Sequence, residues 1–413
     1  MKVLISAYAC DPYRGSEPGI GWNLVSSIAR RHDVFLITDI HNREGIEKAC
    51  IEGLIPPNIT IRYLRKVRPF NRNRLIAHLQ SWMYFAAFNR LILDAAAEWH
   101  SEETFDLCHQ VTIAAWRMPS PLWRLPIPFV WGPIGGAGFI PPVFRSMLSL
   151  PARLFETLRD ASTWYVSRSQ AFRQCIEKTK IVIAANQETQ DFLNPFRNPR
   201  HMIRLPSGSI TPQRIRKFAR PESALILGRA LRLFAGGNME GRKGVSLALR
   251  ALQKVVEAGV DFHYTVAGGG PEFRSLQLLA AQLGLSDKVT FHPGYQGQDY
   301  VDALHDTEVY FLPSFRETTP ATLLEAYLAG CYPVVADTSA QGEIVRMAGG
   351  HAIDATNEEE MVLRLTQAII WCSENRSELQ GLAAKSKSII IDYFSAERHD
   401  AVLEEIYTMA IAK

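Results

Sequence analysis

The chain has 413 residues, of which 47% are hydrophobic, 21% charged and 10% aromatic, a balance typical of a folded globular protein with two or three domains. The net charge of only +3 and the lack of a recognised binding motif disfavour nucleic acid as a partner. We find no signal peptide and no uncharged apolar run long enough to cross a bilayer, and the six cysteines form no CxxC pair. These features predict a cytoplasmic protein with buried, reduced thiols.

Short apolar segments alternate with helical patterns along the whole chain. In the first half the predicted strands are Val3–Ser6, Val34–Thr38, Ile59–Leu64, Asp106–Gln110, Pro128–Gly132 and Ile181–Asn186. After a polar, basic stretch they are Leu231–Gly236, Phe262–Ala267, Val289–His292, Val309–Pro313 and Tyr332–Ala336. This alternation, present twice, predicts an α/β protein with two doubly wound domains whose parallel sheets are covered on both faces.

The same pattern predicts the domain limits. We expect a first domain at 1–205, a linker at 206–228, a second domain at 229–393, and a C-terminal helix at 394–413 that packs back on the first domain. Because ligands of such sheets bind at the carboxyl ends of strands, the default site is a cleft between the two domains.

Charge is spread unevenly along the chain. Residues 1–200 hold 24 Lys+Arg against 17 Asp+Glu, a balance of +7, and residues 201–413 hold 21 against 25, or −4. The stretch 62–74 has six basic residues and no acid, and it precedes an aromatic stretch at 75–99. Two interpretations remain open: segment 62–90 rests on an anionic membrane surface, peripherally at the inner face of the cytoplasmic membrane, or it is a solvated loop followed by a core helix.

Two carboxylates stand eight positions apart in Glu-Thr-Thr-Pro-Ala-Thr-Leu-Leu-Glu, which runs from Glu317 to Glu325 between a predicted strand and a predicted helix. Thr319 suits the N-cap and Pro320 the first helical position. The free N–H groups at this helix start, from Ala321 and Thr322, together with the helix dipole, could seat a phosphate. The segment therefore favours a binding site for a phosphorylated sugar. The alternative is that the two carboxylates are surface acids at a connection between a strand and a helix.

A lysine follows the first strand of the second domain. Lys243 ends Gly236-Gly-Asn-Met-Glu-Gly-Arg-Lys, where a flexible cation could neutralise a diphosphate that gains charge as a sugar departs. Arg242 beside it could add a planar fork of donors. Two solvated loop cations are the alternative. In the first half, Gly19 and Gly21 follow the first predicted strand, where they permit close approach of the backbone to phosphate or sugar, or simply form a tight turn.

Taken together, these segments resemble glycosyltransferase family 4, the retaining branch of glycosyl transferases group 1 with the GT-B fold of two facing Rossmann-like domains. The resemblance rests on the Glu-x7-Glu element at 317–325, Arg-Lys-Gly at 242–244, Val-Ala-Gly-Gly-Gly-Pro at 266–271, Gly15-Ser-Glu-Pro-Gly-Ile-Gly-Trp, the strand end at 106–109 and Pro128-Phe-Val-Trp-Gly-Pro-Ile-Gly-Gly. The chain departs from the family pattern at Asn238, where an arginine is usual, and at Thr319-Pro320, where Phe-Gly is common.

The resemblance implies a glycosyltransferase that moves a hexosyl group from a UDP- or GDP-sugar to a hydroxyl with retention and without a metal or other cofactor. The acceptor would be a saccharide or lipid-linked saccharide of bacterial surface polysaccharide or exopolysaccharide biosynthesis. The implied catalytic residues are His109, Lys243 and Glu317. The implied donor-binding residues are Gly19, Gly21, Arg242, Lys243, Tyr295, Glu317, Thr319, Ala321, Thr322 and Glu325, the last as acceptor of ribose hydroxyls. Gly135 and Gly136 would line the acceptor side, and Glu343 matches a family acid near the nucleotide.

Other classes of protein stay open on the sequence. A nucleotide-sugar epimerase or a phosphorylase can be built on the same two-domain fold. A nicotinamide-dependent oxidoreductase is disfavoured because Gly-x-Gly-x-x-Gly is absent. A non-catalytic nucleotide-sugar binding protein would tolerate the departures at Asn238 and Pro320.

Overall fold

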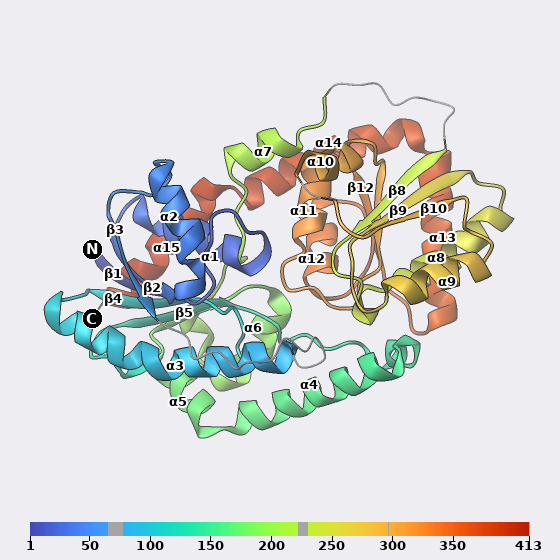
Figure 1. Ribbon diagram of the computed structural model, residues 1–413. Helices are drawn as coiled ribbons and strands as arrows, with labels where there is room; N and C mark the ends of the chain where they lie inside the picture. Colours follow the sequence, from blue (N-terminus) through green and yellow to red (C-terminus); the bar gives the residue numbers. More distant parts are fainter. Residues whose placement is uncertain (65–76, 222–229, 296, 413) are drawn as a thin grey trace. The chain divides into compact units, whose positions relative to one another are not determined.

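The structure is a computed structural model that describes residues 1–64, 77–221, 230–295 and 297–412 (Figure 1). The chain forms two compact units. Unit 1 comprises Met1–Ala137, Ala161–Ser209 and Ala396–Lys413, and unit 2 comprises Gly138–Asp160 and Ile210–Ser395. These limits differ from the sequence expectation in two places: residues 138–160 fall in unit 2, and the expected linker contains a helix of unit 2, α7 (Pro212–Phe218).

Unit 1 is built on a parallel sheet in the order β3-β2-β1-β4-β5-β6-β7. Its strands are β1 (Lys2–Ala7), β2 (Asp33–Asp39), β3 (Ile59–Leu64), β4 (Leu107–Thr112), β5 (Phe129–Ile134), β6 (Ile181–Ala184) and β7 (Met202–Arg204). The chain starts in the middle of the sheet, builds outward to β3, then returns to β4 on the other side of β1. That reversal is the topological switch point of a doubly wound sheet.

Successive residues of β1 point to opposite faces of the sheet, and both faces are buried. Val3 and Ile5 pack in one apolar cluster with Tyr407 of α15 (Ala396–Ile411), whereas Leu4 packs in another with Phe85 of α3 (Ala77–Glu102). Strands buried on both faces read as continuous apolar runs, which explains why these segments were recognisable in the sequence. The helices and short 3-10 turns of this unit are α1 (Ser16–Ala29), η1 (Ile40–Asn42), α2 (Arg43–Ile51), α3 (Ala77–Glu102), η3 (Leu122–Arg124), α5 (Gln170–Lys178), α6 (Gln187–Leu193), η5 (Asn194–Phe196), η6 (Pro199–His201) and α15 (Ala396–Ile411).

Unit 2 repeats the plan with the parallel order β10-β9-β8-β11-β12-β13. The strands are β8 (Leu231–Gly236), β9 (Phe262–Ala267), β10 (Val289–His292), β11 (Val309–Leu312), β12 (Tyr332–Ala336) and β13 (His351–Ile353). The helical elements are η4 (Pro142–Met147), α7, η7 (Gly241–Lys243), α8 (Val245–Glu257), α9 (Phe273–Gln282), α10 (Gly297–His305), α11 (Ala321–Leu328), α12 (Ser339–Ala348), α13 (Glu358–Glu374) and α14 (Arg376–Tyr393). Helix α4 (Leu150–Arg168) begins in unit 2 and ends in unit 1.

Helix α8 shows how the sequence fixes these covering helices. Its apolar residues recur at helical spacing as Val245, Ala248, Leu249, Leu252 and Val255, and all five are buried in the core of unit 2. Such a stripe is the face that an amphipathic helix buries against a sheet. Burial of each large side chain stabilises the unit by about 1.5–3 kcal/mol before the entropy of ordering is subtracted.

The aromatic stretch after the basic cluster is a core helix in its described part. Phe85, Phe88, Ile92, Ala96 and Trp99 form one stripe of α3, and all five are buried in unit 1. This is the second of the two interpretations given above for that stretch. The basic residues at 65–74 lie outside the described residues, and membrane contact through 62–90 stays a prediction.

Two further observations concern the chain as a whole. None of the helices in the described part is both long and apolar enough to pass through a membrane. The six cysteines are free; five of them are buried, as expected, whereas Cys50 is exposed. The fold class expected from the sequence, two doubly wound α/β domains, is also confirmed.

Candidate active site

The strongest constellation of polar groups lies at the topological switch point of the sheet in unit 2. Strands β8 and β11 are neighbours there, and the strand order reverses between them. The loop after β8 carries Lys243, and the loop after β11 carries Glu317. Because ligands of open parallel sheets bind outside the carboxyl ends of strands at such a point, the topology alone brings these two side chains to the expected place.

The two loops are packed directly on each other. Gly244 has φ +66°, and a Cβ there would come within 2.1 Å of the Pro313 carbonyl oxygen. The Phe315 N–H donates a 2.7 Å hydrogen bond to the Arg242 carbonyl. A glycine is therefore required to end the lysine loop, because any side chain would separate the loops that set the position of Lys243.

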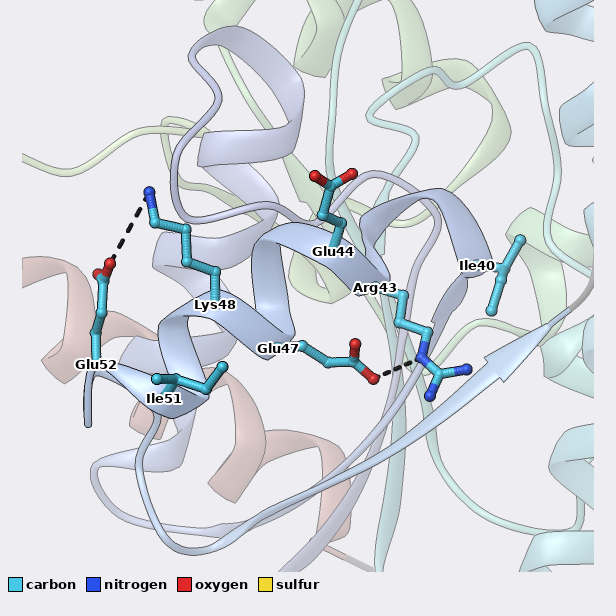
Figure 2. Close-up of a pocket in the computed structure, with 7 residues that line it drawn as sticks. All are labelled: Ile40, Arg43, Glu44, Glu47, Lys48, Ile51 and Glu52. Atoms are coloured by element: carbon cyan, nitrogen blue, oxygen red, sulfur yellow. Dashed lines mark hydrogen bonds and ion pairs between the residues drawn. The ribbon is translucent and has the colours of Figure 1, made fainter.

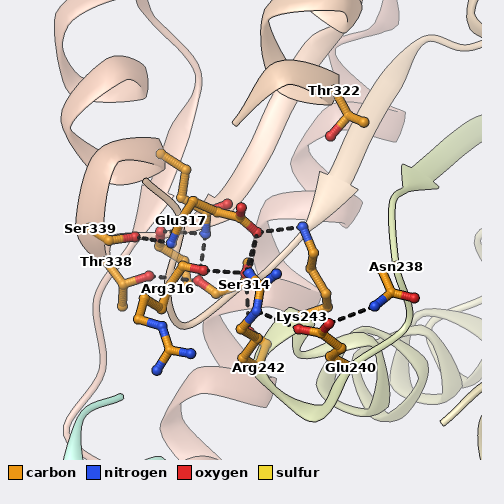
Figure 3. Close-up of polar contacts among 12 residues, drawn as sticks. Asn238, Glu240, Arg242, Lys243, Ser314, Arg316, Glu317, Thr322, Thr338 and Ser339 are labelled. Carbon is orange, nitrogen blue, oxygen red and sulfur yellow. Dashed lines mark hydrogen bonds and ion pairs between the residues drawn. The ribbon is translucent and has the colours of Figure 1, made fainter. Parts of the chain in front are cut away.

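Lys243 and Glu317 form a buried ion pair (Figure 3). The Lys243 Nζ lies 2.6 Å from Glu317 Oε1, and the two residues are only 7% and 8% exposed. Ser314 Oγ donates to the same carboxylate oxygen at 2.7 Å, and Arg242 Nη1 lies 3.4 Å from it. Lys243 and Glu317 were predicted from the sequence to belong to one site, and in the structure their side chains are in contact.

The charge state of Glu317 follows from these contacts. Burial alone would raise the pKa of its carboxyl, but Lys243, then Arg242, and hydrogen bonds from Lys243 and Ser314 favour the ionised form, and the net result is a lowered pKa. Glu317 is therefore an anion at neutral pH. A buried carboxylate that keeps its charge can accept hydrogen bonds from hydroxyl groups of a ligand.

The backbone around Glu317 is held by the next helix of the unit. The Glu317 N–H donates to Ser339 Oγ at 2.7 Å, and Ser339 has the positive φ of +49°. The Ser314 carbonyl accepts hydrogen bonds from Thr338 Oγ1 and Gln341 Nε2, each at 2.6 Å. The loop after β11 is thus fixed by side chains at the start of α12, which limits the positions that Glu317 can adopt.

The helix start after Glu317 differs from the sequence prediction. Helix α11 begins at Ala321, so Pro320 rather than Thr319 is the N-cap residue. The Ala321 N–H donates to the Thr319 carbonyl at 2.9 Å, and this donor is therefore already used. Thr322 packs its methyl group near Gly236, and its hydroxyl bonds to Tyr310 at 2.8 Å. One of the two N–H groups of the predicted phosphate seat, that of Ala321, is thus engaged within the chain, and the seat formed by Ala321 and Thr322 stays a prediction.

Glu325 is positioned by two residues that the sequence reading missed. Arg214 of α7 donates to Oε1 at 2.8 Å, and Tyr300 of α10 donates to Oε2 at 2.7 Å. Burial, and after it the charge of Glu325, raises the pKa of the Tyr300 phenol, so its hydroxyl remains a donor. Neither partner has a local motif that marks it, since Arg214 lies in the expected linker and Tyr300 in an ordinary helix.

The glycine-rich segment after β9 supports the lysine loop rather than presenting free backbone. A Cβ at Gly268 would fall 1.8 Å from the Gly237 carbonyl oxygen, and the Met239 N–H donates to Gly269 at 2.8 Å. Further along, Tyr295 stacks on His292 with ring centroids 3.9 Å apart and an interplanar angle of 7°. Asn238, which replaces the usual arginine, donates to Glu240 Oε1 at 2.5 Å.

His109 does not fit the role that the resemblance implied. It is fully buried inside unit 1, where its Nε2 lies 2.7 Å from the Gly132 carbonyl and its Nδ1 lies 2.7 Å from the Tyr407 hydroxyl. The carbonyl requires a proton on Nε2, so Nδ1 accepts from Tyr407. Burial lowers the pKa of His109 to about 4. Both ring nitrogens are used, and the residue is a neutral core histidine with no atom left for a sugar.

Gly19 and Gly21 also require a correction. They lie within α1, whereas the sequence placed them in a loop before it. A Cβ at Gly21 would lie 2.1 Å from the Ala9 carbonyl oxygen, and one at Gly19 would lie 2.5 Å from that of Arg14. These glycines let the loop after β1 pack against the helix, and their close approach is to the chain itself.

The two glycines expected on the acceptor side lie after β5 in unit 1. The Gly135 N–H donates to the Ala114 carbonyl at 2.9 Å, and the Gly136 carbonyl accepts from Arg117 at 2.7 Å. Both therefore hold the loop that follows β4. Their predicted role at an acceptor stays a prediction.

One further hollow of about 490 Å³ lies beside α2 in unit 1 (Figure 2). Its lining residues are Ile40, Arg43, Glu44, Glu47, Lys48, Ile51 and Glu52. Arg43 pairs with Glu47 and Lys48 with Glu52 along the exposed helix. These charges satisfy each other and offer no convergent chemistry. Within the described ranges, no three His, Cys, Asp or Glu side chains gather as a metal site would require.

Sequence comparison assigns part of unit 2 to a known family. Residues 218–380 match the family described as glycosyl transferases group 1. The chain is 29% identical over 175 residues to WcaL of Escherichia coli (strain K12), named as a candidate glycosyltransferase of colanic acid biosynthesis, covering 36% of this chain and 42% of WcaL. It is 28% identical over 180 residues to the 2-deoxystreptamine glucosyltransferase of Streptomyces kanamyceticus, covering 42% and 44%. The chain thus spans less than half of the length of these relatives.

Comparison of structures covers almost the entire chain. Sucrose-phosphate synthase of Thermosynechococcus elongatus has a TM-score of 0.69 at 16% identity over 98% of both chains. HepE of Anabaena, solved with UDP and glucose, has a TM-score of 0.62 at 15% identity over 99% of both. WaaG, a glycosyltransferase involved in lipopolysaccharide biosynthesis, has a TM-score of 0.60 at 17% identity over 97% of this chain and 99% of WaaG. The protein has the GT-B fold of glycosyltransferases, and its residues 218–380 match the glycosyl transferases group 1 family.

Proposed function

We propose that the protein transfers a glycosyl group from a nucleotide sugar to a hydroxyl acceptor with retention at the anomeric carbon. The observation that carries the proposal is the buried Lys243–Glu317 pair at the switch point of unit 2, inside the segment that matches the family. A cation and an ionised carboxylate side by side suit a ligand that carries both phosphate and sugar hydroxyl groups. Since HepE was solved with UDP and glucose, and one relative is named a glucosyltransferase, UDP-glucose is the first donor to test, and GDP-sugars follow.

The roles of the two charged groups follow from their donors and acceptors. The Lys243 ammonium gives one hydrogen bond to Glu317 and has two further protons for a phosphate oxygen. As the glycosidic bond to the diphosphate breaks, Lys243 and Arg242 would stabilise the growing negative charge without a metal. Glu317 would hold hydroxyls of the donor sugar beside the reacting carbon, and Glu325 would hold the ribose hydroxyls.

The chemical step needs no nucleophile from the protein. The acceptor hydroxyl would attack from the face that the diphosphate leaves, its oxygen forming the new bond to the anomeric carbon. Its proton would pass to the departing phosphate oxygen, so that bonds and charges balance. Because both ring nitrogens of His109 are engaged in the core of unit 1, we assign His109 no part in this step.

We place the acceptor among saccharides or lipid-linked saccharides of bacterial surface polysaccharide or exopolysaccharide biosynthesis. The names of WcaL and WaaG, which refer to colanic acid and lipopolysaccharide, support this class. The acceptor itself is best found by offering a panel of mono- and disaccharides with the donor in hand.

Product analysis tests the proposal. The purified chain is incubated with UDP-glucose and the acceptor panel in the presence of a chelator, and released UDP and the new linkage are followed by chromatography and NMR. An α-linked product from the α-linked donor, with UDP released, is expected. Epimerised donor without UDP release would favour the epimerase, and a thermal shift without any turnover would favour a binding protein.

A further inference from the structure

One segment of unit 2 comes from the first half of the chain. Residues Gly138–Asp160 contain η4 and the first part of α4, and they belong to unit 2. The loop after β11, which carries Glu317, packs against this segment. The Phe315 ring lies nearly parallel to the Phe144 ring of η4, with centroids 4.9 Å apart and an interplanar angle of 13°. Both rings are buried, so this contact fixes the loop two residues before Glu317.

The residue directly before Glu317 is held by the same segment through an ion pair. The two terminal nitrogens of Arg316 donate to the two carboxylate oxygens of Glu156 in α4, the Nη2–Oε1 bond being 2.9 Å long. Such a fork fixes the orientation of the guanidinium as well as its distance from the acid. Glu156 and Arg316 are 160 positions apart, so no local pattern in the sequence indicated their contact.

The fork directs the Arg316 side chain away from Glu317. Figure 3 shows the Arg316 guanidinium pointing away from the Glu317 carboxylate, which contacts Lys243 instead. The Arg316 carbonyl accepts a 2.8 Å hydrogen bond from Arg242, so the backbone stays at the candidate site while the side chain is bound to α4. A buried cation that loses its partner is strongly unfavourable. Without Glu156, the nearest carboxylate along the chain for Arg316 would be that of Glu317.

The same segment also contacts the loop after β8. A Cβ at Gly241 would lie 3.0 Å from Leu148 Cδ2 and 3.4 Å from Ala152 Cβ, so the glycine lets η7 lie directly on the start of α4. Burial opposes the positive charge of Arg242, but the surrounding carboxylates, of which Glu156 is one, raise its pKa. Residues 138–160 thus support both loops of the candidate site by packing and by charge.

We propose that Glu156 is a positioning residue of the donor site: by holding Arg316, it keeps the Glu317 carboxylate in contact with Lys243. The inference rests on the proposed function, because it assigns Glu156 a part in that reaction. Glu156 acts only through the loop after β11 and touches no substrate. Removal of its charge would release Arg316, whose guanidinium would compete with the Lys243 ammonium for Glu317.

Steady-state kinetics of Glu156→Gln tests the proposal, because glutamine keeps the shape of the side chain and removes its charge. We expect kcat to fall by about ten-fold or more, since a small displacement of Glu317 matters most at the reacting carbon. The KM for the donor should change by less than about two-fold, since Arg242 still binds the diphosphate. Adding Arg316→Met removes the competing cation, and this double variant should recover at least about half of the lost kcat on a logarithmic scale.

A matched control is available on the same helix. Asp160 also pairs with an arginine, Arg145 of η4, which belongs to neither the loop after β8 nor the loop after β11. Asp160→Asn should therefore leave kcat within about two-fold of the unaltered chain. Should Glu156→Gln not fold, Arg316→Lys carries the same test, because lysine keeps the cation but cannot form the fork, and kcat should again fall.

A second measurement does not depend on turnover. Urea denaturation of Lys243→Met, Glu317→Gln and their double variant gives the coupling energy of the pair, both in the otherwise unaltered chain and in the Glu156→Gln background. The coupling should be smaller in the Glu156→Gln background, because Arg316 then replaces Lys243 at the carboxylate. If the unaltered chain turned over no donor at all, the proposed function would fail, and this coupling would still test the role of Glu156.

Three results would overturn the proposal. The first is a coupling energy between Lys243 and Glu317 that Glu156→Gln leaves unchanged. The second is a folded Glu156→Gln variant with the kcat of the unaltered chain. The third is a loss of kcat that Arg316→Met does not recover, which would make the Glu156–Arg316 pair a purely structural contact.

Discussion

Lys243 donates a 2.6 Å hydrogen bond to Glu317 at a point where both side chains are buried. Two opposite charges taken out of water depend on each other, because removing one leaves the other unpaired in a medium of low dielectric. The pair that we assign to the donor is therefore also part of the stability of unit 2, and the two effects can be measured separately.

The first prediction concerns this pair. Lys243→Met and Glu317→Gln should each lower the free energy of unfolding by about 3 kcal/mol, the low end for a buried pair, since Arg242 and Ser314 also contact the carboxylate. The double variant should lower the free energy of unfolding by clearly less than the sum of the two single changes. Urea denaturation of the unaltered chain, the two single variants and the double variant gives the coupling energy. Each single variant should also lose at least about ten-fold in turnover. Strictly additive unfolding energies would show that the contact carries no mutual stabilisation.

Much of the sheet architecture could be read from the sequence, and the exceptions have a common cause. The bounds of β8, β9, β10 and β12 agree with the predicted segments, because each is a short, largely apolar run that ends at a glycine, a proline or an aspartate. Strands β7 and β13 were missed, since each has three residues and lies at the outer edge of its sheet, where few apolar positions are needed.

In the candidate site, contacts that follow from the strand order could be predicted, whereas contacts between residues far apart in the sequence could not. Lys243 and Glu317 follow neighbouring strands, so a parallel topology brings them together. The environment of His109 depends instead on Tyr407, which is 298 positions away in the sequence. No local pattern distinguishes a strand-end histidine that contacts a ligand from one that is covered by a helix distant in the sequence. Arg214, which contacts Glu325, was missed for the same reason.

The second prediction is a pH dependence of stability caused by His109. Its folded pKa of about 4 lies below the ordinary value of 6.5, so the unfolded chain binds the proton more readily between these values. The stability that neutral His109 provides is complete above pH 6.5 and is lost as the pH falls toward 4, by about 3 kcal/mol in total. Denaturation at several pH values should give a shallower acid slope for His109→Gln than for the unaltered chain. Equal slopes would mean that folding does not change the pKa of His109.

The third prediction concerns the space between Gly237 and the Lys243 amine. This residue has φ +131°, and a Cβ would lie 3.3 Å from Lys243 Nζ. Gly237→Ala should lower stability by about 1–3 kcal/mol through backbone strain and should also displace the amine, with a loss of turnover. Gly294→Ala is the control for stability, because Gly294 has φ +148° but open space where its Cβ would stand. If Gly237→Ala were fully active at saturating donor, the position of the Lys243 amine would not limit the reaction.

The last prediction concerns the support of Glu325. Arg214 and Tyr300 each occupy one of its carboxylate oxygens, and the remaining lone pairs can accept ribose hydroxyls only if the group stays in this orientation. Arg214→Gln should therefore weaken UDP binding several-fold in calorimetric titration, and Tyr300→Phe should lower the free energy of unfolding by about 1 kcal/mol. Arg216→Gln, an exposed change on the same helix, removes the same charge and should leave UDP affinity unaltered. A long-range charge effect would weaken UDP binding in both arginine variants alike, whereas loss of a contact that orients Glu325 weakens it only in Arg214→Gln. Equal UDP affinities of the two variants would therefore place the ribose away from Glu325.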